Sequence, residues 1–404
     1  KAQPANRDSS TSRGLGDVYK RQLMNRRIKK VAVLGSGIMG AGIACHFANI
    51  GVEVLLLDII SKEPNELEKK KGLDATHLSV RNRIVTDNLT TAVKSKPAPL
   101  YHPSFKAHIE IGNFEEDMPK LSEVDWIIEV VVERLDIKKL VFEQVEQHRT
   151  PGTLVSSNTS GIPIKFMNEG RSKDFQEHFT VTHFFNPPRY LKLFEVVPGP
   201  SCKPEVVDFL MDYGTRFLGK SAVLAKDTPA FIGNRIGIFC IQSLFHQMKP
   251  MGLTVEEVDK LTGPVMGRPK SATFRTVDVV GLDTLVHVAK GLHENCADDE
   301  RRNSFTLPDF IQKMMDEQWL GSKSGQGFYK KIKTKEGKSE IQVLDLETMT
   351  YHSKKKVSFT TLEKTKTVER VADRFPILIS GTDKAAKFYR TVLGETFAYV
   401  QYRI

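Results

Sequence analysis

The sequence contains few cysteines and no long apolar run, and both absences exclude classes of protein. Its four cysteines (Cys45, Cys202, Cys240 and Cys296) include no C-x-x-C pair, so neither a disulfide framework nor a thiolate zinc site is indicated. No metal-ligand spacing occurs elsewhere, and no apolar stretch approaches the ~20 residues of a membrane-spanning helix. We therefore expect a cytoplasmic protein with no metal site and no membrane partner.

Acidic residues are outnumbered by basic ones, 49 to 59, which leaves a formal net charge of +10. Such a surplus suits either nucleic acid or a substrate that carries phosphates. Because the chain has no basic motif with interleaved aromatic residues, we expect no nucleic-acid partner. With 40% hydrophobic and 27% charged residues, the composition is that of an ordinary globular protein.

Residues 1–23 show neither an apolar period nor the core of a signal peptide, which predicts a disordered segment without function. The string D-V-Y-K-R-Q at 17–22 matches the translated end of a transposon-type sequencing adapter. We interpret the segment as an artefact of a DNA sequencing library and Met24 as the initiator. A natural mobile tail is the alternative.

Residues 24–226 alternate short apolar runs with helical segments. A first strand at Val31–Leu34 leads through a glycine cluster and a helix to a second strand, 52–57, that ends on Asp58. Continuous apolar strands of this kind are typical of a parallel sheet that is covered on both faces. The alternation predicts a doubly wound α/β domain of Rossmann type. Further strands are expected at 126–132, 153–157, 181–185, 191–197 and 222–224.

The strand signal stops after Asp227, and an all-helical domain is predicted over 227–330. Residues 331–366 are polar and lysine-rich with one weak strand pattern at 341–344, which is typical of a linker. Residues 367–404 include an amphipathic period from Asp383 and are predicted to begin a further helical domain. The alternative is a terminal helix that packs back onto the preceding domain. The helices expected in 227–330 are 231–248, 255–261, 274–289 and 308–318.

The turn after the first strand, G-S-G-I-M-G at 35–40, predicts a dinucleotide site because it joins a strand to a helix. Its first glycine permits the tight turn, the second lets the backbone approach a pyrophosphate, and the third lets helix and strand pack closely. The phosphates bind at the helix N-terminus, where N–H groups are free. The predicted contacts are Gly35, Gly37, Ile38, Met39 and Gly40.

An acidic residue, Asp58, ends the second strand. A carboxylate at this position accepts hydrogen bonds from the ribose hydroxyls and repels a 2′-phosphate. The predicted cofactor is therefore NAD rather than NADP.

Four polar strings follow at strand ends or at the domain junction. They are S-N-T-S at 157–160, H-F-F-N-P at 183–187, Glu195, and K-D-T-P-A-F-I-G-N-R at 226–235. Together with the glycine cluster and a closing G-x-K-x-G-x-G-F-Y string at 321–329, their order and spacing resemble the L-3-hydroxyacyl-CoA dehydrogenase family of fatty-acid β-oxidation. The resemblance covers about residues 28–330. It implies oxidation of an (S)-3-hydroxyacyl-CoA to the 3-ketoacyl-CoA with NAD.

Chemistry and resemblance assign the same roles to the polar residues. His183 is the predicted base, because an imidazole is suited to removing a hydroxyl proton near neutral pH. Glu195 is expected to hydrogen-bond the other ring nitrogen, which fixes the tautomer and stabilises the imidazolium. Ser160 and Asn234 are expected to hold the substrate oxygen and the thioester region.

Further properties are implied by the resemblance alone. It implies that residues 59–125 bind the CoA moiety, although Pro97, Pro99 and Pro103 interrupt the helix pair usual there, and it implies a homodimer through the helical domain. Long members join the dehydrogenase to a second helical domain and an enoyl-CoA hydratase domain, so we expect this chain to be the front part of such a bifunctional protein. The further cofactor contacts implied are Glu133, Lys138, Asn158 and Lys323.

Two other functions stay open on the sequence. A dehydrogenase of free hydroxy acids or sugar acids shares the fold without using CoA. A catalytically silent NAD-binding protein is the other alternative, although the complete set of polar residues argues against it. Arg189 and Tyr190 add bulk and charge to the loop after His183, so the acyl-chain length is not predicted.

Overall fold

A computed structural model describes residues 26–334 and 337–403 of the chain. The chain divides into two compact units, with the division in the sequence between Phe231 and Ile232. The predictions for residues 1–23 and for Met24 lie outside the described residues. Within the described ranges, no helix is both long and apolar enough to cross a membrane.

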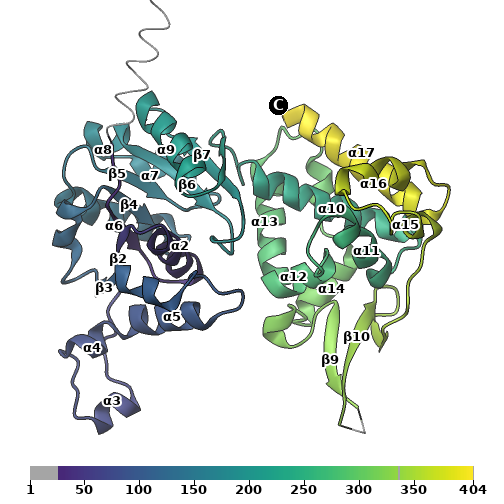
Figure 1. The fold of residues 1–404 in the computed structure, drawn as a ribbon, viewed down its shortest axis with the longest axis horizontal. Helices are drawn as coiled ribbons and strands as arrows, with labels where there is room; N and C mark the ends of the chain where they lie inside the picture. The colour runs from purple at the N-terminus through teal and green to yellow at the C-terminus, as the bar shows by residue number, and fades with distance from the viewer. Residues whose placement is uncertain (1–25, 335–336, 404) are drawn as a thin grey trace, which may run out of the picture. The chain divides into compact units, whose positions relative to one another are not determined.

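The first unit is built on an eight-stranded sheet in the order β3-β2-β1-β4-β5-β6-β7-β8 (Figure 1). The first six strands in this order run parallel, β7 runs antiparallel to β6, and β8 runs parallel to β7. This is the predicted doubly wound order, extended by two strands at one edge. The strands are β1 (Lys30–Leu34), β2 (Glu53–Asp58), β3 (Ile109–Asn113), β4 (Trp126–Glu129), β5 (Leu154–Ser157), β6 (Phe179–Phe184), β7 (Leu193–Pro198) and β8 (Ser221–Leu224).

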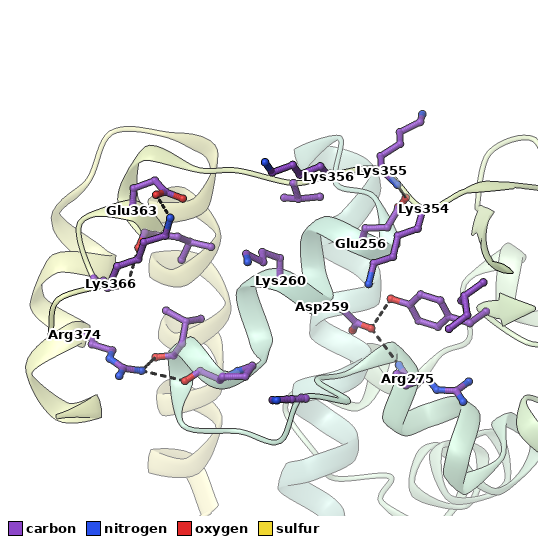
Figure 2. Close-up of a pocket in the computed structure, with 18 residues that line it drawn as sticks. Glu256, Asp259, Lys260, Arg275, Lys354, Lys355, Lys356, Glu363, Lys366 and Arg374 are labelled. Carbon is purple, nitrogen blue, oxygen red and sulfur yellow. Dashed lines mark hydrogen bonds and ion pairs between the residues drawn. The ribbon is translucent and has the colours of Figure 1, made fainter. Parts of the chain in front are cut away.

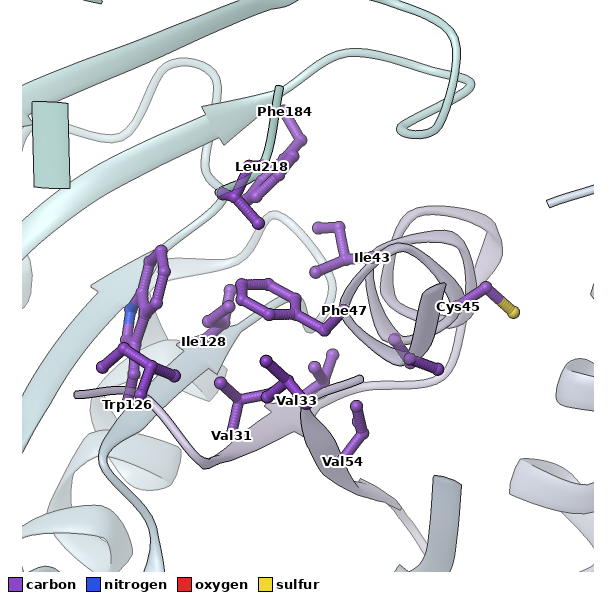
Figure 3. Close-up of a cluster of buried hydrophobic side chains, with 14 of the residues drawn as sticks. Val31, Val33, Ile43, Cys45, Phe47, Val54, Trp126, Ile128, Phe184 and Leu218 are labelled. Atoms are coloured by element: carbon purple, nitrogen blue, oxygen red, sulfur yellow. The ribbon is translucent and has the colours of Figure 1, made fainter. Parts of the chain in front are cut away.

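Helices cover both faces of this sheet because its strands are apolar on both sides. On one face, the ring of Phe47 from α2 packs on Trp126 of β4 with 5.4 Å between centroids (Figure 3). On the other, Phe142 of α6 and Phe175 of α8 pack on Phe179 of β6. The helices of this unit are α2 (Ile38–Asn49), α3 (Glu66–Lys70), α4 (Leu78–Arg81), α5 (Arg83–Lys94), α6 (Leu135–His148), α7 (Ile164–Asn168), α8 (Lys173–Glu177) and α9 (Pro204–Arg216), with 3₁₀ turns η1 (Pro103–His108) and η2 (Met118–Glu123).

Strand β3 is not among the strands predicted from the sequence. It is an edge strand of the sheet and pairs with β2 from Val54↔Ile109 to Asp58↔Asn113. Its sequence, I-E-I-G-N, carries only two large apolar residues. An edge strand buries less of its surface than a central one, so the apolar run that identifies the other strands is missing here.

The second unit is mainly helical. The sequence predicts one helix over 274–289, but the structure divides it into α12 and α13 at Gly281, whose φ of +104° is outside the helical region. The helices are α10 (Gly233–Met251), α11 (Val255–Thr262), α12 (Phe274–Val280), α13 (Leu282–Asn295), α14 (Asp309–Asp316), α15 (Thr360–Glu363), α16 (Val371–Ser380) and α17 (Lys384–Arg403), with 3₁₀ turns η3 (Pro264–Met266), η4 (Arg302–Phe305) and η5 (Ser322–Ser324).

The described residues of the segment predicted as a linker, 331–334 and 337–366, include strands and a short helix. Strands β9 (Tyr329–Lys333), β10 (Ser339–Asp345) and β11 (Thr350–Ser353) form an antiparallel sheet in the order β11-β10-β9. Val343 and Leu344 of β10 are buried in the same apolar core as residues of α11 and α12. Only Val343 and Leu344 of β10 are buried, and three of the five residues of β9 are lysines, so neither strand carries the apolar run that marks a strand in the sequence.

Helices α16 and α17 belong to the second unit. α17 packs along α10, where the ring of Tyr399 stacks on Phe239 with 4.0 Å between centroids. Phe388 and Tyr389 are buried in the core of the unit. This packing agrees with the alternative interpretation of residues 367–404, a helix that returns onto the preceding domain. A further domain that begins here stays a prediction.

A buried carboxylate organises the closing G-x-G-F-Y string. Oδ1 and Oδ2 of Asp278 accept hydrogen bonds from the backbone N–H groups of Phe328 and Tyr329 at 2.8 and 2.9 Å. A Cβ on Gly327 would lie 2.1 Å from Oδ1 of Asp278, so only glycine fits. Burial raises the pKa of Asp278 to about 6, and the two N–H groups oppose that rise.

Candidate active site

The glycine turn has the geometry of a phosphate-binding site. Gly35 has a φ of +104°, and its N–H donates to the carbonyl of Leu57 at 2.8 Å, which joins the ends of β1 and β2. Helix α2 begins at Ile38, and its first backbone bond runs from Ala41 N–H to the carbonyl of Gly37. The N–H groups of residues 38–40 therefore have no partner within the helix. They are available to an anion.

A cavity of about 760 Å³ lies along the carboxyl ends of β1, β2 and β4. Asp58 lines it, and its carboxylate accepts from Ser36 N–H at 2.6 Å, from the Ser36 hydroxyl and from Ile59 N–H at 2.7 Å. Apolar side chains such as Phe114 and Val132 form its walls. The carboxylate at the strand end and the apolar walls suit a ribose and a purine base.

These features fit NAD. A Cβ on Gly37 would meet no atom within 4 Å, so the backbone there is open to a pyrophosphate, whereas a Cβ on Gly40 would lie 1.8 Å from the carbonyl oxygen of Gly35. The turn, the free N–H groups and Asp58 would hold the pyrophosphate and the adenosine ribose. Bound NAD would supply a hydride acceptor at this edge of the sheet.

His183 and Glu195 form a buried pair across the antiparallel strands β6 and β7, where they are directly opposite in register. Nδ1 of His183 lies 2.7 Å from Oε2 of Glu195, which accepts its hydrogen bond. The imidazole is 5% exposed and packs against the rings of Phe185 and Phe231. Among the residues that the structure describes, Nε2 of His183 has no hydrogen-bond partner. This nitrogen is therefore free to take a proton from a ligand.

The S-N-T-S string joins this pair to the end of β4. Oδ1 of Asn158 accepts from the backbone N–H of Phe184 at 2.8 Å, which fixes the residue after His183. Oε1 of Glu133 accepts from Ser160 N–H at 3.1 Å and from the hydroxyl of Thr159. These bonds leave the Ser160 hydroxyl and the Asn158 amide nitrogen without partners within the described residues, available for ligands.

Lys138 lies deeper than its predicted role as a cofactor contact implies. It is 1% exposed, and its ammonium lies 2.7 and 3.0 Å from the two carboxylate oxygens of Glu129 at the end of β4. The Ser157 hydroxyl donates to the same carboxylate at 2.5 Å, and Oε2 of Glu133 lies 3.3 Å from the ammonium. Lys138 thus anchors Glu133, and its side chain does not line the cavity.

The loop after His183 is held from two sides. Lys220, 6% exposed, donates to the carbonyls of Pro188 and, at 2.7 Å, of Leu191. Burial lowers the pKa of Lys220 to about 8. From outside, Arg189 donates to the carbonyls of Ala98 and Leu100 at 2.7 and 2.8 Å, and the Tyr190 hydroxyl donates to Ala98 at 2.9 Å. Arg189 and Tyr190 therefore bind protein backbone.

Comparison with known proteins agrees with this geometry. Residues 30–228 match the NAD-binding domain of 3-hydroxyacyl-CoA dehydrogenase, and residues 231–331 match its C-terminal domain. The chain belongs to the 3-hydroxyacyl-CoA dehydrogenase family. Residues 30–228 are accordingly its NAD-binding domain.

Two relatives of the 3-hydroxyacyl-CoA dehydrogenase family illustrate the similarity, and each is named probable 3-hydroxyacyl-CoA dehydrogenase. That of Bacillus subtilis (strain 168) is 47% identical over 376 residues, which cover 93% of this chain and 47% of the relative. That of Deinococcus radiodurans is 44% identical over 307 residues, which cover 76% of this chain and 84% of the relative. The chain thus spans about half the length of the first and most of the second.

A solved structure of the same family also matches. (S)-3-Hydroxybutyryl-CoA dehydrogenase PaaH1 from Ralstonia eutropha superposes with a TM-score of 0.58 and 25% sequence identity. The match covers 74% of this chain and 98% of that one. The two domains of the family are therefore both present here.

Two predicted site residues of this 3-hydroxyacyl-CoA dehydrogenase family member lie in the second unit. Asn234 is at the start of α10, and Lys323 lies in η5, where its ammonium is 2.5 Å from Oδ2 of Asp283. Their roles stay predictions. The arginines of the segment predicted to bind CoA are paired with acids, Arg81 with Glu115 and Glu116, and Arg83 with Glu68.

Sequence reasoning missed two charged residues that organise the site. Glu129 ends β4 much as Asp58 ends β2, so an acidic residue after a buried apolar run was the signal. Lys220 directly precedes β8. Its side-chain hydrogen bonds to described residues go to backbone carbonyls. No sequence pattern marks a lysine that binds carbonyls of a distant loop.

Proposed function

We propose that this chain is an NAD-dependent (S)-3-hydroxyacyl-CoA dehydrogenase that converts the 3-hydroxyl group of the thioester to a ketone, as in fatty-acid β-oxidation. The observation that carries the proposal is the buried His183–Glu195 pair with a free Nε2 atom. The pair lies at the end of β6, and the carboxyl ends of the parallel strands β1, β2 and β4 line the dinucleotide cavity at the same edge of the sheet.

His183 acts in this proposal as the general base. Its Nε2 atom takes the hydroxyl proton of the substrate while the carbon–oxygen double bond forms. NAD held by the glycine turn and Asp58 would supply the acceptor for the hydride released from the same carbon. Glu195 accepts the Nδ1–H bond throughout, so it holds the tautomer and stabilises the imidazolium that results. In the reverse direction, His183 returns the proton to the ketone oxygen.

Other residues position the substrate. The Ser160 hydroxyl has no partner among the described residues and is suited to hydrogen-bonding the substrate oxygen. Asn158 and Lys220 act indirectly, because they fix the backbone on either side of His183. Asn234 is proposed to bind the thioester region, as the resemblance to the family implies.

The proposal is tested by following NADH oxidation with acetoacetyl-CoA and with free acetoacetate. We expect turnover of the thioester and little or none of the free acid. The exposed His287→Ala variant is a matched control that removes an imidazole elsewhere, and it should leave turnover unchanged. Activity on acetoacetate without activity on acetoacetyl-CoA would instead indicate a dehydrogenase of free acids, and no activity on either would indicate a silent protein.

A further inference from the structure

The second unit contains a strongly basic pocket that the proposed reaction does not use. A hollow of about 810 Å³ is bounded by α11, by residues 354–357 and by the segment from α15 to α16 (Figure 2). Eight lysine and arginine side chains line it, against three carboxylates. Lys260 of α11 lies between the two sides of the pocket in Figure 2. The lining carries a net surplus of five positive charges.

Most of these cations lack an acidic partner. Within residues 26–334 and 337–403, five lining lysines make no side-chain hydrogen bond and no ion pair. The remaining three are engaged: Lys366 with Glu363, Arg374 with the carbonyls of residues 264 and 265, and Arg275 with Asp278 at 3.9 Å. Like charges gathered around one hollow repel one another, so an anion bound there is stabilised by several of them at once. The unpaired lysines are Lys260, Lys270, Lys354, Lys355 and Lys356.

The pocket also has an apolar wall and a buried acceptor. Val357, Leu362 and the ring of Tyr329 line it. Glu256 lines it too and is 4% exposed: its Oε1 accepts from the N–H of Lys355 at 3.3 Å, but its Oε2 is buried without a hydrogen-bond partner. A buried carboxylate oxygen is costly without a donor. These features favour an anionic ligand that also has a flat apolar part and an N–H donor.

We propose that this pocket binds a nucleoside diphosphate group, with the phosphates on the unpaired lysines and the base between the apolar wall and Glu256. Lysine ammonium groups bind phosphates as point charges. An exocyclic amine of the base supplies the donor that Oε2 of Glu256 lacks. The volume lies within the range usual for small-ligand sites. The pocket belongs wholly to the second unit and is separate from the dinucleotide cavity of the first.

Calorimetric titration of the full chain with the Gly37→Ala substitution, whose added methyl group obstructs the dinucleotide turn without touching other protein atoms, tests the proposal; NAD is left out because it carries an ADP group of its own. ADP, coenzyme A and inorganic pyrophosphate are the probes. We expect saturable binding of ADP at one site per chain. Tighter binding of ADP than of coenzyme A would identify a free nucleotide as the ligand, and tighter binding of coenzyme A would identify the diphosphate group of CoA. The double variant Lys354→Glu/Lys356→Glu should weaken ADP by at least about tenfold, because two charge-assisted contacts become repulsive.

The matched control is Lys290→Glu/Lys313→Glu, which changes the net charge equally at exposed lysines of the same unit that do not line the pocket. It should leave ADP affinity within about twofold of the parent chain. Glu256→Gln should weaken ADP binding and leave the affinity for pyrophosphate unchanged. Equal weakening by both charge-reversed variants, or no saturable binding of any probe, would overturn the proposal and reduce the pocket to a solvated basic surface.

Discussion

Two glycines of one turn are expected to respond differently to the same substitution, one in stability and the other in NAD binding. Gly40→Ala places a methyl group 1.8 Å from the carbonyl oxygen of Gly35, so α2 and β1 must move apart. Overpacking of this kind costs roughly 1–3 kcal/mol or more of unfolding free energy. Because 1 kcal/mol shifts the Tm of a domain of this size by about 2–4 °C, the Tm should fall by several degrees.

Gly37→Ala should instead change the stability of the free protein little. Gly37 has φ −55° and ψ −175°, a conformation open to alanine, and no atom lies within 4 Å of the added Cβ. Alanine there restricts the unfolded chain, which is worth about 0.4–1 kcal/mol, and this gain offsets the cost of alanine at the N-cap of α2. NAD affinity should nevertheless fall roughly tenfold to a hundredfold, since the methyl group occupies the approach of the pyrophosphate to the N–H groups, and each charged hydrogen bond is worth about 1.5–3 kcal/mol.

Thermal unfolding without ligand and calorimetric titration with NAD measure the two effects separately. We expect nearly unchanged Tm with weak NAD binding for Gly37→Ala and a fall in Tm for Gly40→Ala. If Gly37→Ala binds NAD as the parent chain does, the pyrophosphate does not lie at the N-terminus of α2. If Gly40→Ala unfolds at the parent temperature, the close approach at Gly35 is refuted.

Four further outcomes are expected. His183→Ala should lower kcat by ~10²–10⁴ with NAD affinity nearly unchanged, and steady-state kinetics that show normal turnover would remove this residue from the reaction. Asp58→Ala should weaken NAD binding and reduce the preference for NAD over NADP, since the repulsion of a 2′-phosphate is lost. An unchanged ratio of the KM values for NAD and NADP would contradict the role of that carboxylate. Lys220→Met leaves two loop carbonyls unpaired, so kcat should fall by roughly tenfold or more with partial rescue in Lys220→Arg; equal kcat in all three chains would show that the loop needs no anchor. Burial raises the pKa of Asp278 from 3.8 to about 6. Between about pH 4 and 6 the folded state therefore binds a proton that the unfolded state has released. The free energy of unfolding should fall by up to ~3 kcal/mol as the pH rises through that window. Denaturant unfolding at pH 4 and 6 should show that fall in the parent chain and a smaller one in Asp278→Asn.

The parts of the site that could be predicted from sequence are those built from local patterns. The glycine turn, Asp58 and the His183–Glu195 pair each stand at the end of an apolar run, and strand order brings such ends to one edge of a sheet. Gly35 adopts a φ of +104°, a conformation that favours glycine. These features depend on neighbours in the chain, so their spacing is visible in the sequence.

The parts that escaped prediction depend on contacts between distant segments. The contact of Lys138 with Glu129, nine residues earlier on another element, has no signal in the sequence. Lys220 reaches a loop about 30 residues away, and Asp278 fixes the backbone of residues 328 and 329, 50 residues further on. A single charged residue in a sequence does not reveal whether its partner is water, a carbonyl or an acid. The edge strand β3 was missed for a related reason, since it carries little apolar surface.

The register of β6 and β7 has a consequence for how this site can change over evolution. His183 and Glu195 face each other because the ladder pairs Val181 with Val197 and Phe184 with Phe194. A slip of one residue in this ladder would turn Glu195 to the opposite face of the sheet. An insertion in residues 185–192 that shifts the register would therefore separate the proton-transfer pair, and the bonds from Lys220 to the carbonyls of residues 188 and 191 restrain the loop against such a shift. The length of the loop is thus tied to the chemistry, whereas its exposed side chains can vary with the substrate.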